Sequence, residues 1–134
     1  MNLLAVSQSG FRKEYVTLSV TGGAELTLSR PGVPSEVHAG VSLFGCLLGV
    51  RETLEAEGLL LCCQGARPDV TTSGMQSQMP DSRHAYTFDL ESRTVNTEMV
   101  DILAPAPFSS VATISEQRAA IFALFNVRKE VDGK

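Results

Sequence analysis

Residues 59–79 read LLLCCQGARPDVTTSGMQSQM, and this stretch decides how the rest of the fold is organised. Its opening run of Leu and Cys predicts a buried strand over 59–64, because such residues leave no polar face for water. Gly65 and Pro68 end that strand, and a polar loop is expected over 65–83. Loops at the end of a buried strand often carry the specific contacts of a small domain.

On the N-terminal side, alternation of apolar and polar residues predicts three strands, near residues 2–8, 14–20 and 24–29 within the region 2–30. A Gly-Gly pair between the second and third strands is typical of a hairpin. The segment 31–35 contains two prolines, which cannot donate to a sheet ladder, so we expect it to end the third strand.

A helix is predicted at about 40–57, where the apolar spacing becomes helical and Arg51 and Glu55 fall largely away from the apolar face. Gly45 and Gly49 each cost about 1 kcal/mol relative to Ala. We therefore expect a close approach of this helix to a sheet. Since the helix leads directly into the next strand, a parallel crossover is possible.

On the C-terminal side, alternation over 84–103 predicts a pair of strands, with a bulge in the second. Thr113 and Glu116 fit a capping box, which begins a helix predicted over 113–128, and the tail 129–134 should fray. Together, these elements predict a single α+β domain, 1–134, with a mainly antiparallel twisted sheet of about five to six strands and two helices packed on it.

Composition restricts the classes of function. A chain of 134 residues with 43% hydrophobic and 19% charged residues suits a globular domain, and a formal charge of −4 without basic clusters argues against nucleic-acid binding. The N-terminus lacks a signal-peptide pattern and the apolar stretch 41–50 is about half a bilayer span, so a soluble, cytoplasmic protein without membrane contact is expected. Cys46, Cys62 and Cys63 are expected to be reduced and packed as small hydrophobic residues.

No cofactor or metal site is predicted, because the thiols and the two histidines lack ligand spacing and no phosphate-binding glycine loop occurs. A small hydrolase would use Ser73 or Cys63 as nucleophile, His84 as base and Asp69 as the group that orients it. Ser73 lacks the G-x-S-x-G context and Cys63 lies in an apolar run, so we expect no enzyme. A ligand-binding domain that uses the loop 65–84 is another alternative.

Within the loop, Arg67 and Asp69 flank Pro68 and are expected to brace it as a hydrogen-bonded pair. Met75 and Met79 fit two roles equally well, as core residues or as adaptable contacts for a partner, since thioethers repack at low cost.

The region from residue 44 to residue 117 contains a pattern of short motifs: L-E-x-x-G, an apolar strand, C-x-G-x-R-x-D-V, S-G-M, a later Met, and A-Y. The resemblance runs from Phe44 through Met79 and continues at Ala85-Tyr86, Val100-Asp101-Ile102 and Thr113 through Gln117. The residues that match the motifs are Leu54, Glu55, Gly58, Cys63, Gly65, Arg67, Asp69, Val70, Ser73, Gly74, Met75, Met79, Ala85 and Tyr86. This pattern resembles small immunity-like proteins of bacterial polymorphic toxin loci, of the Rhs and type VI secretion kind. The sequence departs from that group at 80–84, where the group has a Gly-containing turn, and the resemblance leaves residues 1–40 unassigned.

The resemblance implies an immunity protein: a cytoplasmic partner that binds a co-encoded toxin effector domain, blocks its active site and performs no reaction. Such complexes depend on a few buried anchors and on complementary charge. The partner-binding residues implied in this way are Arg67, Asp69, Thr72, Ser73, Met75 and Met79.

Overall fold

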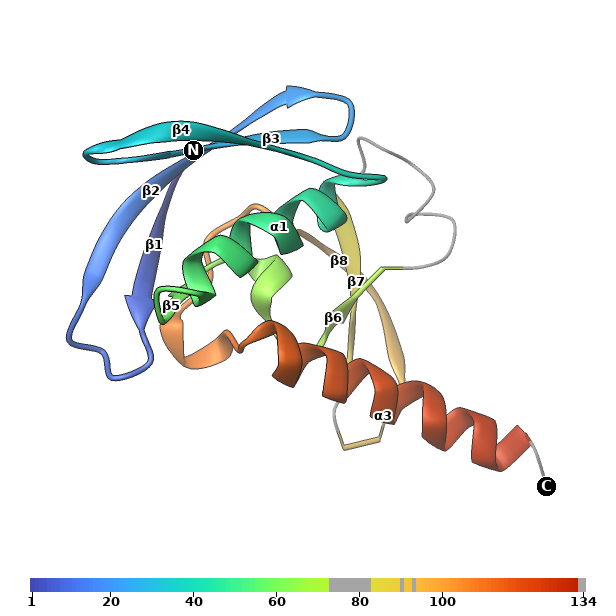
Figure 1. The fold of residues 1–134 in the computed structure, drawn as a ribbon. Coiled ribbons are helices and arrows are strands. Elements are labelled where there is room, and N and C mark those ends of the chain that lie inside the picture. The colour runs from blue at the N-terminus through green and yellow to red at the C-terminus, as the bar shows by residue number, and fades with distance from the viewer. Residues whose placement is uncertain (73–82, 90, 93, 133–134) are drawn as a thin grey trace.

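The computed structural model describes residues 1–72, 83–89, 91–92 and 94–132, and it confirms an α+β fold. One sheet has five strands in the order β4-β3-β2-β1-β5 and curls around helix α1, while a second has three strands in the order β6-β7-β8 (Figure 1). The strands therefore form two sheets, not one. Every strand pair in the described residues is antiparallel, so the parallel crossover considered for the helix and the strand after it is wrong.

The elements follow one another closely along the chain. The strands are β1 (Asn2–Ser7), β2 (Lys13–Gly22), β3 (Glu25–Arg30), β4 (Val33–Ala39), β5 (Leu59–Leu61), β6 (Val70–Thr71), β7 (His84–Phe88) and β8 (Val95–Asp101). The helices are α1 (Leu43–Glu55) and α3 (Ile114–Asp132), with short 3₁₀ turns η1 (Gln64–Ala66) and η2 (Phe108–Ser110). The strand predicted at 59–64 ends at Leu61, and the expected loop contains η1 and β6. Helix α3 extends beyond its predicted end, into the tail that was expected to fray.

The third strand ends at Arg30, as expected, but residues 33–39 form a further strand, β4, that the sequence did not predict. It lies at the sheet edge, and its pairing with β3 shifts register between Leu28 and Arg30. Pro34 therefore occupies an irregular position on an edge strand, where the missing amide donor costs little. A similar shift in the β7–β8 pairing, between Tyr86 and Phe88, matches the bulge expected there.

The core lies between the concave face of the five-stranded sheet and α1. Alternate residues of β1, β2 and β3 are buried together with one side of the helix; they are Leu3, Ala5, Val16, Leu18, Leu26, Leu28, Leu43, Cys46, Leu47, Val50 and Leu54. A Cβ atom on Gly49 would lie 3.0 Å from Nδ1 of His38 on β4, which confirms the close approach of helix and sheet at this position. Cys46, Cys62 and Cys63 are free and buried, as expected of packed thiols.

The capping box of α3 is confirmed. The Thr113 amide donates to Oε1 of Glu116 at 2.9 Å, and the Glu116 amide donates to Oγ1 of Thr113 at 3.1 Å. The C-terminal half of α3 extends away from both sheets (Figure 1). Neither this helix nor another in the described residues has the length and apolar character needed to cross a membrane.

Candidate functional site

The described half of the expected recognition loop is braced as predicted. Arg67 donates from Nε to Oδ1 of Asp69 at 2.9 Å and from Nη2 to Oδ2 at 2.6 Å, and its Nη1 donates to Oε1 of Gln64 at 2.7 Å. The two side chains of the ion pair are only 24% and 25% exposed. A bidentate, half-buried pair of this kind fixes the backbone between its two residues.

Gly65 lets turn η1 cross directly over the core. A Cβ atom at this position would lie 2.5 Å from Cδ2 of Leu47 on α1 and 3.0 Å from Cβ of Ile102. Only glycine fits this contact without moving the neighbouring atoms. The Gly of the C-x-G pattern thus has a packing role.

Beneath this turn lies a buried polar group that we call the Arg51–Gln117 cluster, made of Arg51, Glu55 and Gln117. The Arg51 side chain is 1% exposed. Its Nη1 donates to Oε1 of Gln117 and, at 3.4 Å, to the Gly65 carbonyl, while Nη2 donates to the Ala112 carbonyl at 3.0 Å. Burial lowers the pKa of Arg51, yet a guanidinium stays charged in proteins, so these acceptors compensate a buried cation.

Gln117 connects α3 to the loop. Its Nε2 donates to the carbonyls of Gly65 at 3.0 Å, Arg67 at 2.9 Å and Val70 at 3.3 Å. The side chain is 2% exposed, so water cannot replace these donors. One amide group therefore fixes the backbone over 65–70.

Glu55 completes the cluster from the other helix. Its carboxylate accepts from the Ile114 amide at 3.2 and 3.1 Å, and Oε2 lies 3.9 Å from Nη2 of Arg51. The sequence placed Arg51 away from the apolar face of its helix, and this is wrong because its hydrogen-bonding partners arrive from α3 and η1. The sequence contains no local signal for this pairing.

The six predicted partner-binding residues are not equally displayed. Arg67 and Asp69 belong to the brace, and Thr72 is half-buried at the end of β6. Ser73, Met75 and Met79 lie outside the described residues. The described half of the loop is thus held against the core, and its side chains support the backbone more than they face outward.

The residues considered for hydrolysis are separated by their environments. Cys63 is fully buried, and desolvation raises the pKa of its thiol to about 12, so it is protonated at neutral pH. His84 is exposed at the start of β7, and Ser73 lies outside the described residues. Within the described ranges, no group of three His, Cys, Asp or Glu side chains is placed to hold a metal ion.

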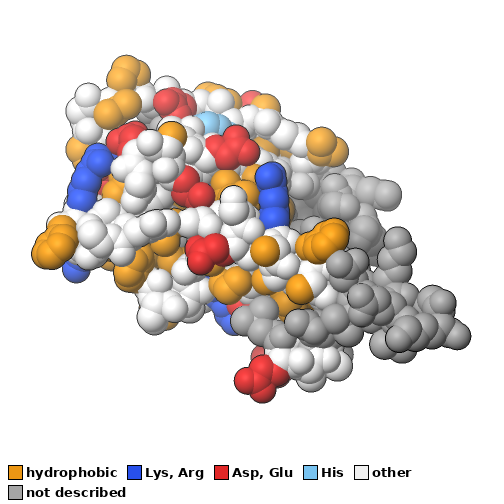
Figure 2. Space-filling model, turned by 60° about the horizontal axis from the view of Figure 1, so that its bottom comes forward, with side chains coloured by type: hydrophobic (Ala, Val, Ile, Leu, Met, Phe, Trp, Pro, Cys, Tyr) orange, Lys and Arg blue, Asp and Glu red, His pale blue; other side chains and the backbone are white. Residues whose placement is uncertain are grey.

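Several large apolar side chains are instead displayed at the surface. Among the side chains that the structure describes, the most exposed of these are Phe11 at 94%, Val41 at 82%, Tyr15 at 68%, Phe122 at 66% and Val37 at 60%. Figure 2 shows one face on which hydrophobic side chains reach the surface between separate acidic and basic ones. Phe11 could not be selected from the sequence, because a single aromatic residue in a turn follows no burial pattern.

Neither a scan of protein-family models nor a search of curated proteins finds a match to this chain.

Proposed function

We propose that this chain is a cytoplasmic immunity protein that binds a co-encoded bacterial toxin domain and neutralises it by covering its active site. The proposal rests on the resemblance of residues 44–117 to immunity-like proteins. The structural observation that carries it is the display of aromatic side chains on ordered backbone, with Phe11 and Tyr15 as the strongest case.

Exposed aromatic residues support a binding role for a physical reason. Phe and Tyr are enriched at protein interfaces, and a few such residues in desolvated pockets supply most of the binding free energy. A single exposed apolar residue is ordinary, but Phe11 is 94% exposed and Tyr15, four residues later, is 68% exposed, which gives two anchors close together in the sequence.

A rigid scaffold supports the same role. The Arg51–Gln117 cluster joins both helices to the backbone of residues 65–70, so little conformational entropy remains to be lost there when a partner binds. An inhibitor needs a fixed surface of this kind and needs no reactive group of its own.

The test is co-expression with the product of the neighbouring gene. If the proposal holds, the toxin domain alone stops growth, co-expression of this chain restores it, and the purified proteins form a complex by calorimetry. If no neighbouring gene encodes a toxic domain, or if the two purified proteins do not associate, the proposed function is wrong.

A further inference from the structure

Phe11 is presented by a turn whose backbone is fixed. In the β1–β2 connection, the Ser7 amide donates to the Arg12 carbonyl at 2.8 Å and the Arg12 amide donates back to Oγ of Ser7 at 3.0 Å. The Gly10 amide also donates to the Ser7 carbonyl at 2.8 Å. These bonds hold the turn in one conformation and leave the neighbouring phenyl ring in water, so the ring can be buried by a partner at little entropic cost.

The base of the same hairpin is fixed by ion pairs. Arg12 Nη2 lies 3.2 Å from Oε1 of Glu57, which follows α1. Arg30, at the end of β3, donates from Nη1 to Oε2 of Glu57 at 2.5 Å and from Nε to Oε1 of Glu14 at 2.7 Å. The hairpin is thereby tied to both β3 and the C-terminal end of α1.

Two further side chains extend this surface along β2. Val16 and Leu18 point into the core, so Lys13 and Tyr15 lie at alternate positions on the outer face, and both are exposed. Tyr15 pairs across the ladder with Leu4, which is half-buried. We call the group formed by Phe11, Lys13 and Tyr15 the hairpin surface.

The charge around the hairpin surface differs from that of the whole chain. Both carboxylates at its base, Glu14 and Glu57, are paired with Arg12 and Arg30. Lys13 has no carboxylate partner among the described residues, so Arg12, Lys13 and Arg30 together with Glu14 and Glu57 sum to +1, whereas the whole chain carries −4. The surface is therefore complementary to an apolar pocket bordered by carboxylates.

We propose that the hairpin surface is the docking site for the toxin domain, with Phe11 in an apolar pocket of that domain and Lys13 facing carboxylates at the rim of the pocket. This assignment rests on the proposed function for the identity of the partner. A protein is favoured over an anionic membrane because one phenyl ring and one displayed cation bury little apolar area, while the acidic remainder of the chain is repelled by anionic lipid.

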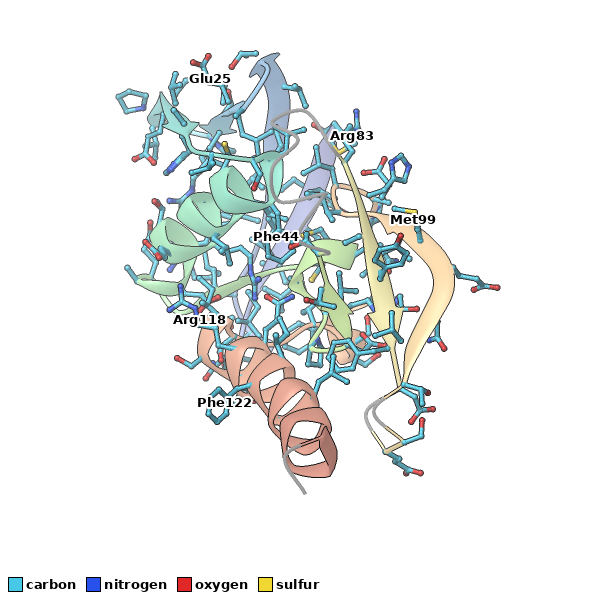
Figure 3. All side chains as sticks on the ribbon, turned by 90° about the vertical axis from the view of Figure 1, so that its right-hand side faces the viewer. Glu25, Phe44, Arg83, Met99, Arg118 and Phe122 are labelled. Carbon is cyan, nitrogen blue, oxygen red and sulfur yellow. The ribbon has the colours of Figure 1, made fainter. Side chains whose placement is uncertain are left out.

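Helix α3 supplies matched control residues. Phe122 and Arg118 are exposed on it, and both point outward (Figure 3). Residues 118 and 122 lie in the N-terminal half of α3, an element separate from the β1–β2 hairpin (Figure 1). The controls thus remove the same kinds of side chain from a different place.

The experiment is calorimetric titration of a catalytically inactive toxin domain, encoded by the neighbouring gene, into the full chain and four variants. We expect Phe11→Ala to weaken binding about 30-fold or more, as for an interface anchor. Lys13→Ala should weaken it by about threefold, less at high salt. Phe122→Ala and Arg118→Ala should stay within about twofold of the unmodified chain. Because Phe11 is almost fully exposed, its variant should keep the unmodified melting temperature.

The outcomes separate the two proposals. If the unmodified chain binds and Phe11→Ala behaves like Phe122→Ala, the docking site is wrong and the proposed function stands. If the unmodified chain does not bind, both are wrong. Flotation with vesicles of equal parts phosphatidylcholine and phosphatidylserine tests whether the hairpin surface binds lipid instead. Sedimentation of the chain alone tests whether it binds a second copy. If Phe11→Ala abolishes association with lipid or with a second copy but leaves toxin binding unchanged, the assignment of the docking site is wrong.

Discussion

Replacing Gln117 with Met gives the most direct test of the Arg51–Gln117 cluster. Met has a similar volume, so the substitution removes the amide without leaving a large cavity. It takes one acceptor from the buried guanidinium of Arg51 and the Nε2 donor from three carbonyls. The loss is concentrated at one side chain that is 2% exposed, where water cannot compensate.

The magnitude follows from the number of bonds. A hydrogen bond to a charged group contributes about 1.5–3 kcal/mol, and each of the two amide protons contributes about 1 kcal/mol. Gln117→Met should therefore lower the free energy of unfolding by about 4 kcal/mol and the melting temperature by about 15 °C. Urea unfolding followed by circular dichroism measures the change in midpoint at constant slope.

Two comparisons make this result specific. Asn96 is an exposed residue on β8 whose Nδ2 donates to Oγ1 of Thr87 at 3.1 Å. Asn96→Ala should lower the free energy of unfolding by less than about 1 kcal/mol. In a double-mutant cycle, Arg51→Met and Gln117→Met should be coupled by about 1.5 kcal/mol or more. A Gln117→Met variant within about 1 kcal/mol of the unmodified protein, or a coupling near zero, would refute the structural role given to the cluster.

Three other predictions follow from single contacts. Hydrogen bonds from Arg30 depress the pKa of Glu57 to about 2 from 4.5, so its stabilising effect is present above pH 4.5 and is lost as pH falls through 2. Glu57→Gln should therefore be less stable than the unmodified protein at pH 7, and thermal melts should converge as pH approaches 2; a constant difference would contradict this. Gly65→Ala should destabilise by about 2–4 kcal/mol in urea, because its Cβ would contact core atoms, whereas Gly23→Ala, with open space around it, should change stability by less than about 1 kcal/mol. The thiol of Cys63 should react with a disulfide reagent only at the rate of unfolding, and rapid labelling of that residue in the native protein at pH 8 would show that it is not buried.

Local signals in the sequence were sufficient for much of the fold. Strands β1 to β3 follow alternation because one face is buried, and the capping box of α3 involves residues three apart. The brace between Arg67 and Asp69 was also predictable, since two residues flanking a proline are close in any compact turn.

The features that could not be predicted from the sequence depend on residues that are distant from one another in the chain. Strand β4 was missed because proline argues against a strand unless the strand is known to be at an edge, and edge position depends on the other strands. Helical periodicity predicts that Arg51 is exposed because it is charged, whereas the acceptor that allows its burial, Gln117, lies 66 residues away in the sequence. For the candidate site, Phe11 follows no period and was not selected.

The separation between Arg51 and Gln117 also sets an order of events during synthesis on the ribosome. Until residues beyond 112 have emerged, the guanidinium of Arg51 lacks the oxygens of Ala112 and Gln117, and the carbonyls of Gly65, Arg67 and Val70 lack the Gln117 amide, although most of the core sequence is already present. The Arg51–Gln117 cluster can therefore form only at a late stage of translation. Contacts between residues far apart in the sequence form slowly, so we expect the native packing around this cluster to be completed late in folding.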